Sequence, residues 1–198
     1  MTSMGENDPV KWTRAVQHLE ALATACDEMR GLPLPVTQLW VFGQFLESPA
    51  DLDSVHVALA VDLPEVPWLS APAGASHWAN ATRMARNPFT PVWRSARAPI
   101  WNHFVVRPAL VWDISAGVSS DALTAIRDEK AERVRIPAPG AEELRTRLDD
   151  ELAISLAAMR SKVSAYQQKR WSPGKLEPVA DDLHAVTTGY LDILDASR

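Results

Sequence analysis

The stretch VTQLWVFGQFLESPADLDSVHVALAVDL, residues Val36 to Leu63, decides the fold of this chain. Its first part, Val36 to Phe42, has no charge and is rich in β-branched and aromatic residues, which is typical of a strand covered on both faces. Its last part, Ser54 to Leu63, alternates large apolar residues with small or polar ones, as a second strand does. A short acidic connection joins the two strands, so the stretch predicts the centre of a sheet.

Small residues on one face of the second strand, Ala58 and Ala60 among them, predict a helix packed closely against that face. The helix expected from Asp8 to Arg30 is the candidate, because its apolar residues recur at helical spacing. Asp8 followed by a proline is a good start for that helix, and the glycine after Arg30 is a good end.

The rest of the chain adds a third strand and two helices. His103 to Asp113 predicts the strand, in which Pro108 indicates an edge position or a bulge. A long helix ending near Trp171 follows from one apolar stripe: Leu144, Leu148, Leu152, Leu156, Met159, Val163 and Tyr166. A final helix follows from a second stripe: Val179, Leu183, Val186, Tyr190 and Leu194. We therefore expect an α+β protein, with a small mixed sheet covered by an N-terminal helix and a C-terminal antiparallel helical hairpin. The core is expected over residues 8–136 and the hairpin over 139–198, packed as a single compact unit.

Composition excludes several classes of protein. The chain has 198 residues, a formal net charge of −5 and one cysteine, Cys26. The negative charge argues against general nucleic-acid binding, and a single cysteine excludes an internal disulfide framework or a multi-cysteine zinc site. No secretory leader and no long apolar run is apparent, so we expect a cytoplasmic location without membrane insertion.

Two aspartates before the second strand are the first candidates for chemistry. Asp51 and Asp53 have side chains of the same parity, and with Asp113 they could hold a magnesium ion. Phe42-Gly43, Asp51-Leu52-Asp53 and a late Asp113 resemble the pattern of the nucleotidyltransferase superfamily. That resemblance implies that Asp51 and Asp53 bind metal and triphosphate and that Asp113 activates the attacking hydroxyl. The alternative is that the two aspartates form a turn.

A basic segment is the second candidate. No acidic residue stands between Glu65 and Asp113, while arginines and tryptophans alternate there. Such a mixture can bind an anionic ligand, form a protein interface, or pair with acidic helices of the same chain. The residues expected to contact a ligand are Arg94, Arg97, Trp101, Asn102, His103 and Arg107.

A closer resemblance runs from Val36 to Asp113. The succession LWVFG (39–43), VHVALAVDLP (55–64), HWAN (77–80) and PIWNH (99–103) resembles a bacterial family of uncharacterised proteins with a domain of unknown function, which implies no activity. The leading hypothesis is a non-catalytic, nucleotidyltransferase-like module that binds an anionic small molecule, nucleotide or partner. The alternatives are an active magnesium-dependent nucleotidyltransferase and an antitoxin-like or accessory protein-interaction subunit.

Overall fold

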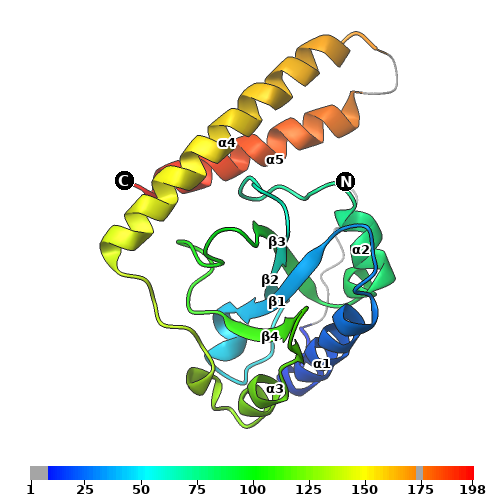
Figure 1. Ribbon diagram of the computed structural model, residues 1–198, viewed down its shortest axis with the longest axis vertical. Helices are drawn as coiled ribbons and strands as arrows, with labels where there is room; N and C mark the ends of the chain where they lie inside the picture. The colour runs from blue at the N-terminus through cyan, green and yellow to red at the C-terminus, as the bar shows by residue number, and fades with distance from the viewer. Residues whose placement is uncertain (1–8, 173–175) are drawn as a thin grey trace.

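A five-stranded mixed sheet with helices on both sides forms the fold (Figure 1). The computed structural model describes residues 9–172 and 176–198. The strands are β1 (Val36–Phe42), β2 (Val55–Val61), β3 (Phe89–Ser95), β4 (Ala109–Asp113) and β5 (Gly117–Val118), in the spatial order β3-β2-β1-β4-β5. The helices are α1 (Trp12–Glu28), α2 (Ala75–Ala81), α3 (Ser120–Arg127), α4 (Ala141–Lys169) and α5 (Glu177–Ala196), with short 3₁₀ turns η1 (Gly43–Leu46), η2 (Met84–Arg86) and η3 (Ala131–Arg133). The predicted α+β class is confirmed.

The two predicted central strands are confirmed as an antiparallel pair. Leu39 lies opposite Leu59, and Val41 lies opposite Val57. Gly43, with a φ of +78°, takes the left-handed conformation that turns the chain into η1. The pair occupies the middle of the sheet, with β3 parallel to β2 on one side and β4 antiparallel to β1 on the other.

The third predicted strand is wrong over residues 103–108. β4 begins only at Ala109, because Pro108 has no N–H to donate and Arg107 has a φ of +46°, which no extended strand adopts. β4 is an inner strand rather than an edge, although its pairing with β1 does contain a register shift.

The expectation that the N-terminal helix covers the alanine face is also wrong. α1 packs in one cluster with Val57 and Leu59, on the opposite face of β2. Ala58 and Ala60 instead face Trp68 and the hairpin of α4 and α5. The small side chains there make room for a tryptophan and a buried arginine, whereas α1 approaches its own face closely because it brings alanines of its own. Asp8, the expected start of this helix, lies outside the described residues.

The helical hairpin is confirmed. α4 and α5 run antiparallel, cross the alanine side of the sheet and continue past it (Figure 1). Leu148 of α4 and Ile193 of α5 are buried in the same cluster as Phe42 and Ala58. Among the described residues, no helix is both long enough and apolar enough to cross a membrane.

Candidate functional site

The three candidate carboxylates do not come together. Asp113 of β4 lies opposite Gln38 of β1, and Gln38 lies opposite Ala60, near the end of β2. Asp53 lies just before the beginning of β2. From His56 to Ala60 the extended strand spans roughly 13 Å. Within residues 9–172 and 176–198, no three His, Cys, Asp or Glu side chains lie close enough to share a metal ion. The described residues therefore show no carboxylate cluster at the magnesium site that the nucleotidyltransferase hypothesis would require.

Asp113 is occupied by its own surroundings. Gln38 Nε2 donates to its Oδ2 at 2.9 Å, and both the hydroxyl and the backbone N–H of Ser115 donate to its Oδ1. These hydrogen bonds, those from Ser115 first, lower the pKa of Asp113 to about 2. A carboxylate held ionised in this way is a poor proton acceptor, so its role is to close the turn after β4.

Arg94 lies inside the protein, at the junction between the sheet and α4. Its side chain is 1% exposed and forms an ion pair with Glu151 of α4. Arg94 Nε also donates to the carbonyl of Ile100 at 3.1 Å, and its guanidinium lies 5.3 Å from the ring centre of Trp68. The charge is fully used within the chain, so Arg94 cannot meet an external anion.

Glu151 gathers a second cation and an amide. Asn102 Nδ2 donates to its Oε2 at 3.0 Å, and Arg147 Nε lies 2.9 Å from its Oε1 without an N–H aimed at the oxygen. Burial, and then the charge of Arg94, lower the pKa of Arg147. Asn102 also accepts from the backbone N–H groups of Phe104 and Val105, so it fixes the loop before β4. We call Arg94, Asn102, Arg147 and Glu151 the junction cluster.

The other two arginines of the expected ligand site are also paired. Arg97 Nε lies 3.1 Å from Asp62, and Arg107 Nη2 lies 2.6 Å from Glu132. Only Arg94 pairs with the C-terminal helices, since Asp62 follows β2 and Glu132 belongs to η3. Each of these three arginines thus meets an acid of the same chain, and the expected cationic cavity has no free guanidinium group to offer.

Trp101 and His103 lie in different surroundings. Trp101 borders a cavity of about 380 Å³, whose lining also includes Glu142, Glu143 and Asp150. Three acids against one cation, Arg147, disfavour an anion in this cavity. His103 Nε2 lies 2.8 Å from Asp192 Oδ2, to which Trp68 Nε1 donates at 2.7 Å, so this histidine connects the loop before β4 to α5. The expected ligand residues are therefore spread over the junction instead of lining one site.

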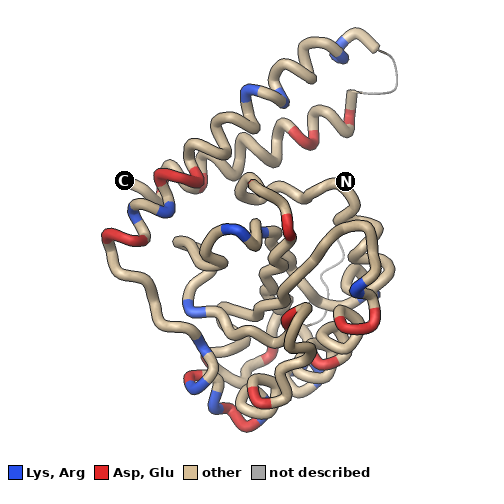
Figure 2. The backbone as a smooth tube through the Cα atoms, viewed as in Figure 1, with Lys and Arg blue, Asp and Glu red and all other residues tan. Residues whose placement is uncertain are grey.

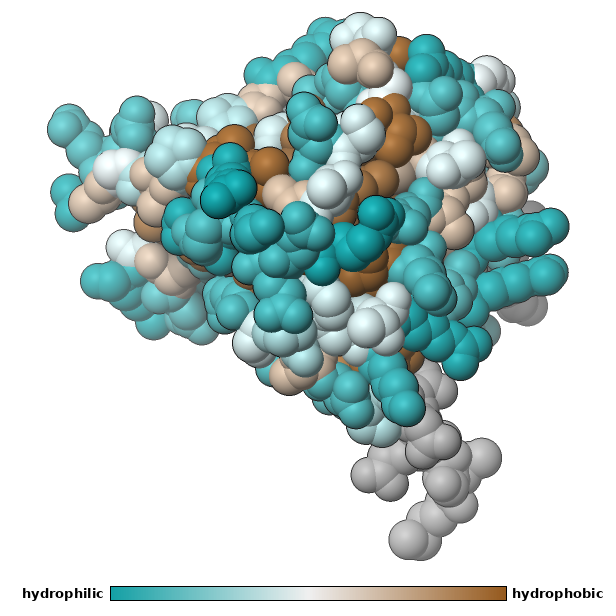
Figure 3. Space-filling model, turned by 90° about the horizontal axis from the view of Figure 1, so that it is seen from below, coloured by the Kyte–Doolittle hydropathy of each residue, from teal (hydrophilic) through white to brown (hydrophobic). Residues whose placement is uncertain are grey.

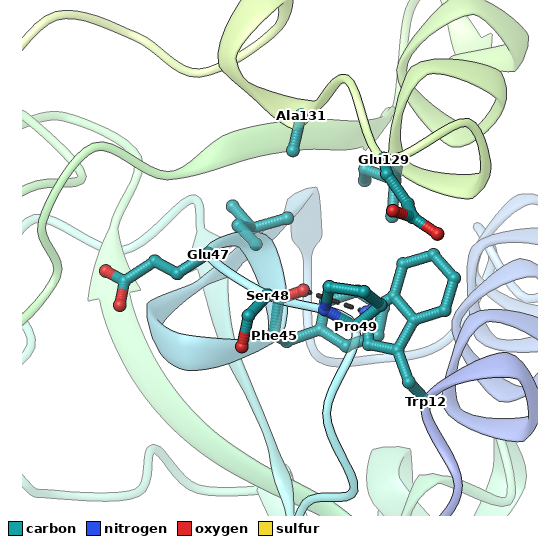
Figure 4. A pocket seen from close by; sticks show the side chains of 9 residues that line it. Trp12, Phe45, Glu47, Ser48, Pro49, Glu129 and Ala131 are labelled. Atoms are coloured by element: carbon teal, nitrogen blue, oxygen red, sulfur yellow. Dashed lines mark hydrogen bonds between the residues drawn. The ribbon is translucent and has the colours of Figure 1, made fainter.

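A small pocket opens beside α1 and α3. It has a volume of about 150 Å³ and is bordered by Trp12, Phe45, Glu47 and Glu129 (Figure 4). Trp12 Nε1 donates to the carbonyl of Phe45 at 3.1 Å and closes one wall. Seen from below, the protein is mostly hydrophilic, with hydrophobic residues visible between polar ones (Figure 3). With acids as its only charged lining and so small a volume, the pocket indicates no particular chemistry.

The helical hairpin divides into two halves with different surroundings. The near half comprises residues 141–155 of α4 and 186–196 of α5, and the far half comprises 156–169 and 177–185. Every buried residue of the two helices lies in the near half: Arg147, Leu148, Glu151, Ser155, Val186, Gly189 and Ile193. In the far half the apolar side chains are at most half-buried, and Val163 is 39% exposed.

Charge divides the far half by helix (Figure 2). Its α4 segment carries Arg160, Lys162 and Lys169 and no acid, and its α5 segment carries Glu177, Asp181 and Asp182 and no lysine or arginine. Of these six residues, only Lys162 and Asp182 form an ion pair, with each other, in the part of the chain that the structure describes. This surface was not predicted from the sequence, although residues 152–172 contain no aspartate or glutamate.

Comparison with known proteins gives a family without a function. A family model described as "Domain of unknown function (DUF7711)" matches residues 10–198. No curated protein and no solved structure matches the chain significantly.

Proposed function

The chain belongs to the DUF7711 family of unknown function, and we propose that it acts as an accessory protein-interaction subunit whose far half of the hairpin binds a second copy of the chain. The observation that carries this proposal is the contrast in burial along the hairpin. A stripe at helical spacing continues from the covered near half into the far half, where it is only half-buried. An apolar helix stripe is normally covered by another element, and here α4 and α5 cover each other's stripe only in part.

In the far half, α4 and α5 pack on each other along one face of each helix. Met159 and Tyr166 of α4 and Val179 and Leu183 of α5 remain partly exposed. Two helices cannot enclose their own apolar side chains, whereas four helices can do so around a common core. A second hairpin is therefore a fitting cover.

Charge selects a second copy as the occupant. In a two-fold arrangement the basic α4 segment of one chain can face the acidic α5 segment of the other, and the same contact then occurs twice. The alternative register, α4 against α4, places Arg160 and Lys169 near like charges and is disfavoured. The far half is thus complementary to itself in one orientation only.

The test is the oligomeric state of charge-reversed chains. Sedimentation of the wild-type chain is expected to give a dimer. Arg160→Glu with Lys169→Glu, and separately Glu177→Lys with Asp181→Lys, are each expected to weaken dimerisation at least tenfold, because each double variant places like charges across the interface. Mixing the two variants in equal amounts is expected to restore a dimer of one chain of each kind.

Arg145→Glu serves as the control, since Arg145 is exposed on the near half and its variant is expected to dimerise like the wild type. A wild-type chain that remains monomeric at several hundred micromolar would overturn the proposal. So would a dimer that all of the far-half variants leave unchanged, because the interface would then lie on another face.

A further inference from the structure

An open groove runs between α1 and the segment of α2 and η2, on the side of the sheet away from the hairpin. Its volume is about 690 Å³, in the range of small-molecule sites. Its lining comes from α1 on one side and from Ala81, Thr82, Arg83, Arg86 and Asn87 on the other; α1 and α2 are labelled in Figure 1. A second hollow of about 400 Å³ adjoins it and shares His18, Arg86 and Asn87 with it, so the two form one elongated depression.

The cations of this groove differ from those at the junction. Arg14, His18, Arg83 and Arg86 line it, and in the described part of the chain none of them forms an ion pair. The depression also contains two acids: Glu28 lines the larger hollow and Asp53 lines the smaller one. Arg14 and His18 stand one helical turn apart on α1 and line the same hollow. Burial and then the charge of Arg14 lower the pKa of His18.

The turn that carries two of the arginines is held in an uncommon conformation. Arg83 has a φ of +59°, a left-handed conformation that side-chain-bearing residues rarely adopt. Asn87 Nδ2 donates to the carbonyl of Arg83 at 3.0 Å, and Arg86 N donates to the same carbonyl at 3.1 Å. The strained residue is thus fixed from two sides, and Arg83 and Arg86 are presented on one short turn.

The wall formed by α1 is apolar in part. Leu22, Ala25 and Met29 line the groove there, beside His18, Thr24 and Glu28 of the same helix. A planar guanidinium binds phosphate by two parallel hydrogen bonds, and the apolar wall suits an uncharged body attached to that phosphate. The chain as a whole has a net charge of −5 and does not attract anions in general. The unpaired cations of the groove therefore indicate a local site for an anion.

We propose that this groove binds a phosphate monoester with an apolar body, with Arg83 and Arg86 holding the phosphate. The proposal is independent of the hairpin's role, because the groove and the hairpin lie on opposite sides of the sheet. It also lies away from the arginines that the sequence indicated.

Calorimetric titration of the full chain with phenyl phosphate and with inorganic phosphate, at matched ionic strength, tests it. Phenyl phosphate is expected to bind, and to bind at least threefold more tightly than inorganic phosphate. The variant Arg83→Gln with Arg86→Gln is expected to weaken phenyl phosphate binding tenfold or more, since two charge-assisted hydrogen-bond donors are lost. Arg145→Gln, an exposed arginine outside the groove, is expected to bind within twofold of the wild type.

Three results would overturn the proposal. One is the absence of binding by either probe to the wild-type chain. Another is equal affinity of the wild type and the double variant for phenyl phosphate, with both proteins folded by circular dichroism. If inorganic phosphate bound as tightly as phenyl phosphate, the apolar wall would have no part in recognition and the ligand class proposed here would be wrong.

Discussion

The two halves of the helical hairpin belong to the same helices and differ in what they touch. In the near half, Glu151 is 4% exposed and lies between two arginines, and Gly189 packs directly on the backbone of Trp68. In the far half, no described residue is buried, and charges of opposite sign lie on opposite helices. One pair of helices thus serves first as part of the fold and then as a surface.

This difference predicts which substitutions will affect stability and which will affect the association that we propose. Charges enclosed in the near half hold the hairpin on the sheet, and their removal affects folding. Charges in the far half lie at the surface and contribute little to the stability of the monomer. They are expected to affect mainly the binding of a partner. Substitutions in the two halves should therefore separate folding from association.

The largest effect is expected from Glu151→Ala. Removing this carboxylate leaves Arg94 and Arg147 buried without a counter-charge and Asn102 without its acceptor. Breaking a buried ion pair on one side costs about 3–5 kcal/mol of unfolding free energy. Urea denaturation followed by tryptophan fluorescence measures the loss.

Asp149→Ala is the matched control, because Asp149 is exposed on the same helix, two positions before Glu151. It is expected to change the unfolding free energy by less than about 0.5 kcal/mol. Similar losses in both variants would mean that the junction cluster does not hold the hairpin, and the comparison between the two halves would fail.

A somewhat smaller effect is expected from Gly189→Ala. In an exposed helix this change stabilises by about 1 kcal/mol, because alanine is the better helix former. Here a Cβ would overlap the carbonyl group of Trp68, so the helix must move away from the core, at a cost of about 2 kcal/mol. Thr188→Ala, at the exposed neighbouring position, is the control in the same urea experiment. Stabilisation by Gly189→Ala would show that α5 does not pack closely here.

Features that depend on neighbouring residues could be predicted from the sequence better than contacts between distant residues. The strand from Val36 to Phe42 was predicted with its bounds, because its composition is a local property. The end of β4 was predicted and its beginning was not, since Arg107 adopts a left-handed conformation that nothing in its neighbourhood requires.

Long-range pairing was beyond the sequence. Arg94 was expected among ligand-binding residues, and its partner Glu151 lies 57 positions later on another element. The face covered by α1 was mistaken because both faces of β2 are buried, and parity alone cannot say which helix lies on which face. Asp51, Asp53 and Asp113 matched the order of a known motif, but the fold does not bring the three side chains together.

Asp113→Asn provides a reference in the sheet, away from both halves of the hairpin. The pKa of Asp113 is lowered from 3.8 to about 2 in the folded chain, so its stabilising effect is complete above pH 3.8 and is lost as the pH falls towards 2. The variant is expected to unfold about 1 kcal/mol more easily than the wild type at pH 6, after allowance for solvent screening. At pH 2, where the folded carboxyl is half protonated, the difference is expected to fall to a small fraction of its value at pH 6. A constant difference in urea stability from pH 6 to pH 2 would contradict this assignment.

The smallest effect on the monomer, and the sharpest test of the comparison, is expected from Val163→Ser in the far half. Val163 is 39% exposed, so its replacement should change the unfolding free energy of the monomer by less than about 0.5 kcal/mol. The same change at Leu148, which is 3% exposed in the near half, should cost about 2–5 kcal/mol. The far-half variant should instead differ in association. The melting temperature of a dimer rises with protein concentration, and Val163→Ser should reduce that rise by removing an apolar contact.

Two outcomes would contradict the comparison between the halves. A wild-type melting temperature that does not depend on protein concentration would mean that the far half does not bind a second copy of the chain. A large loss of monomer stability in Val163→Ser would mean that both halves belong to the fold.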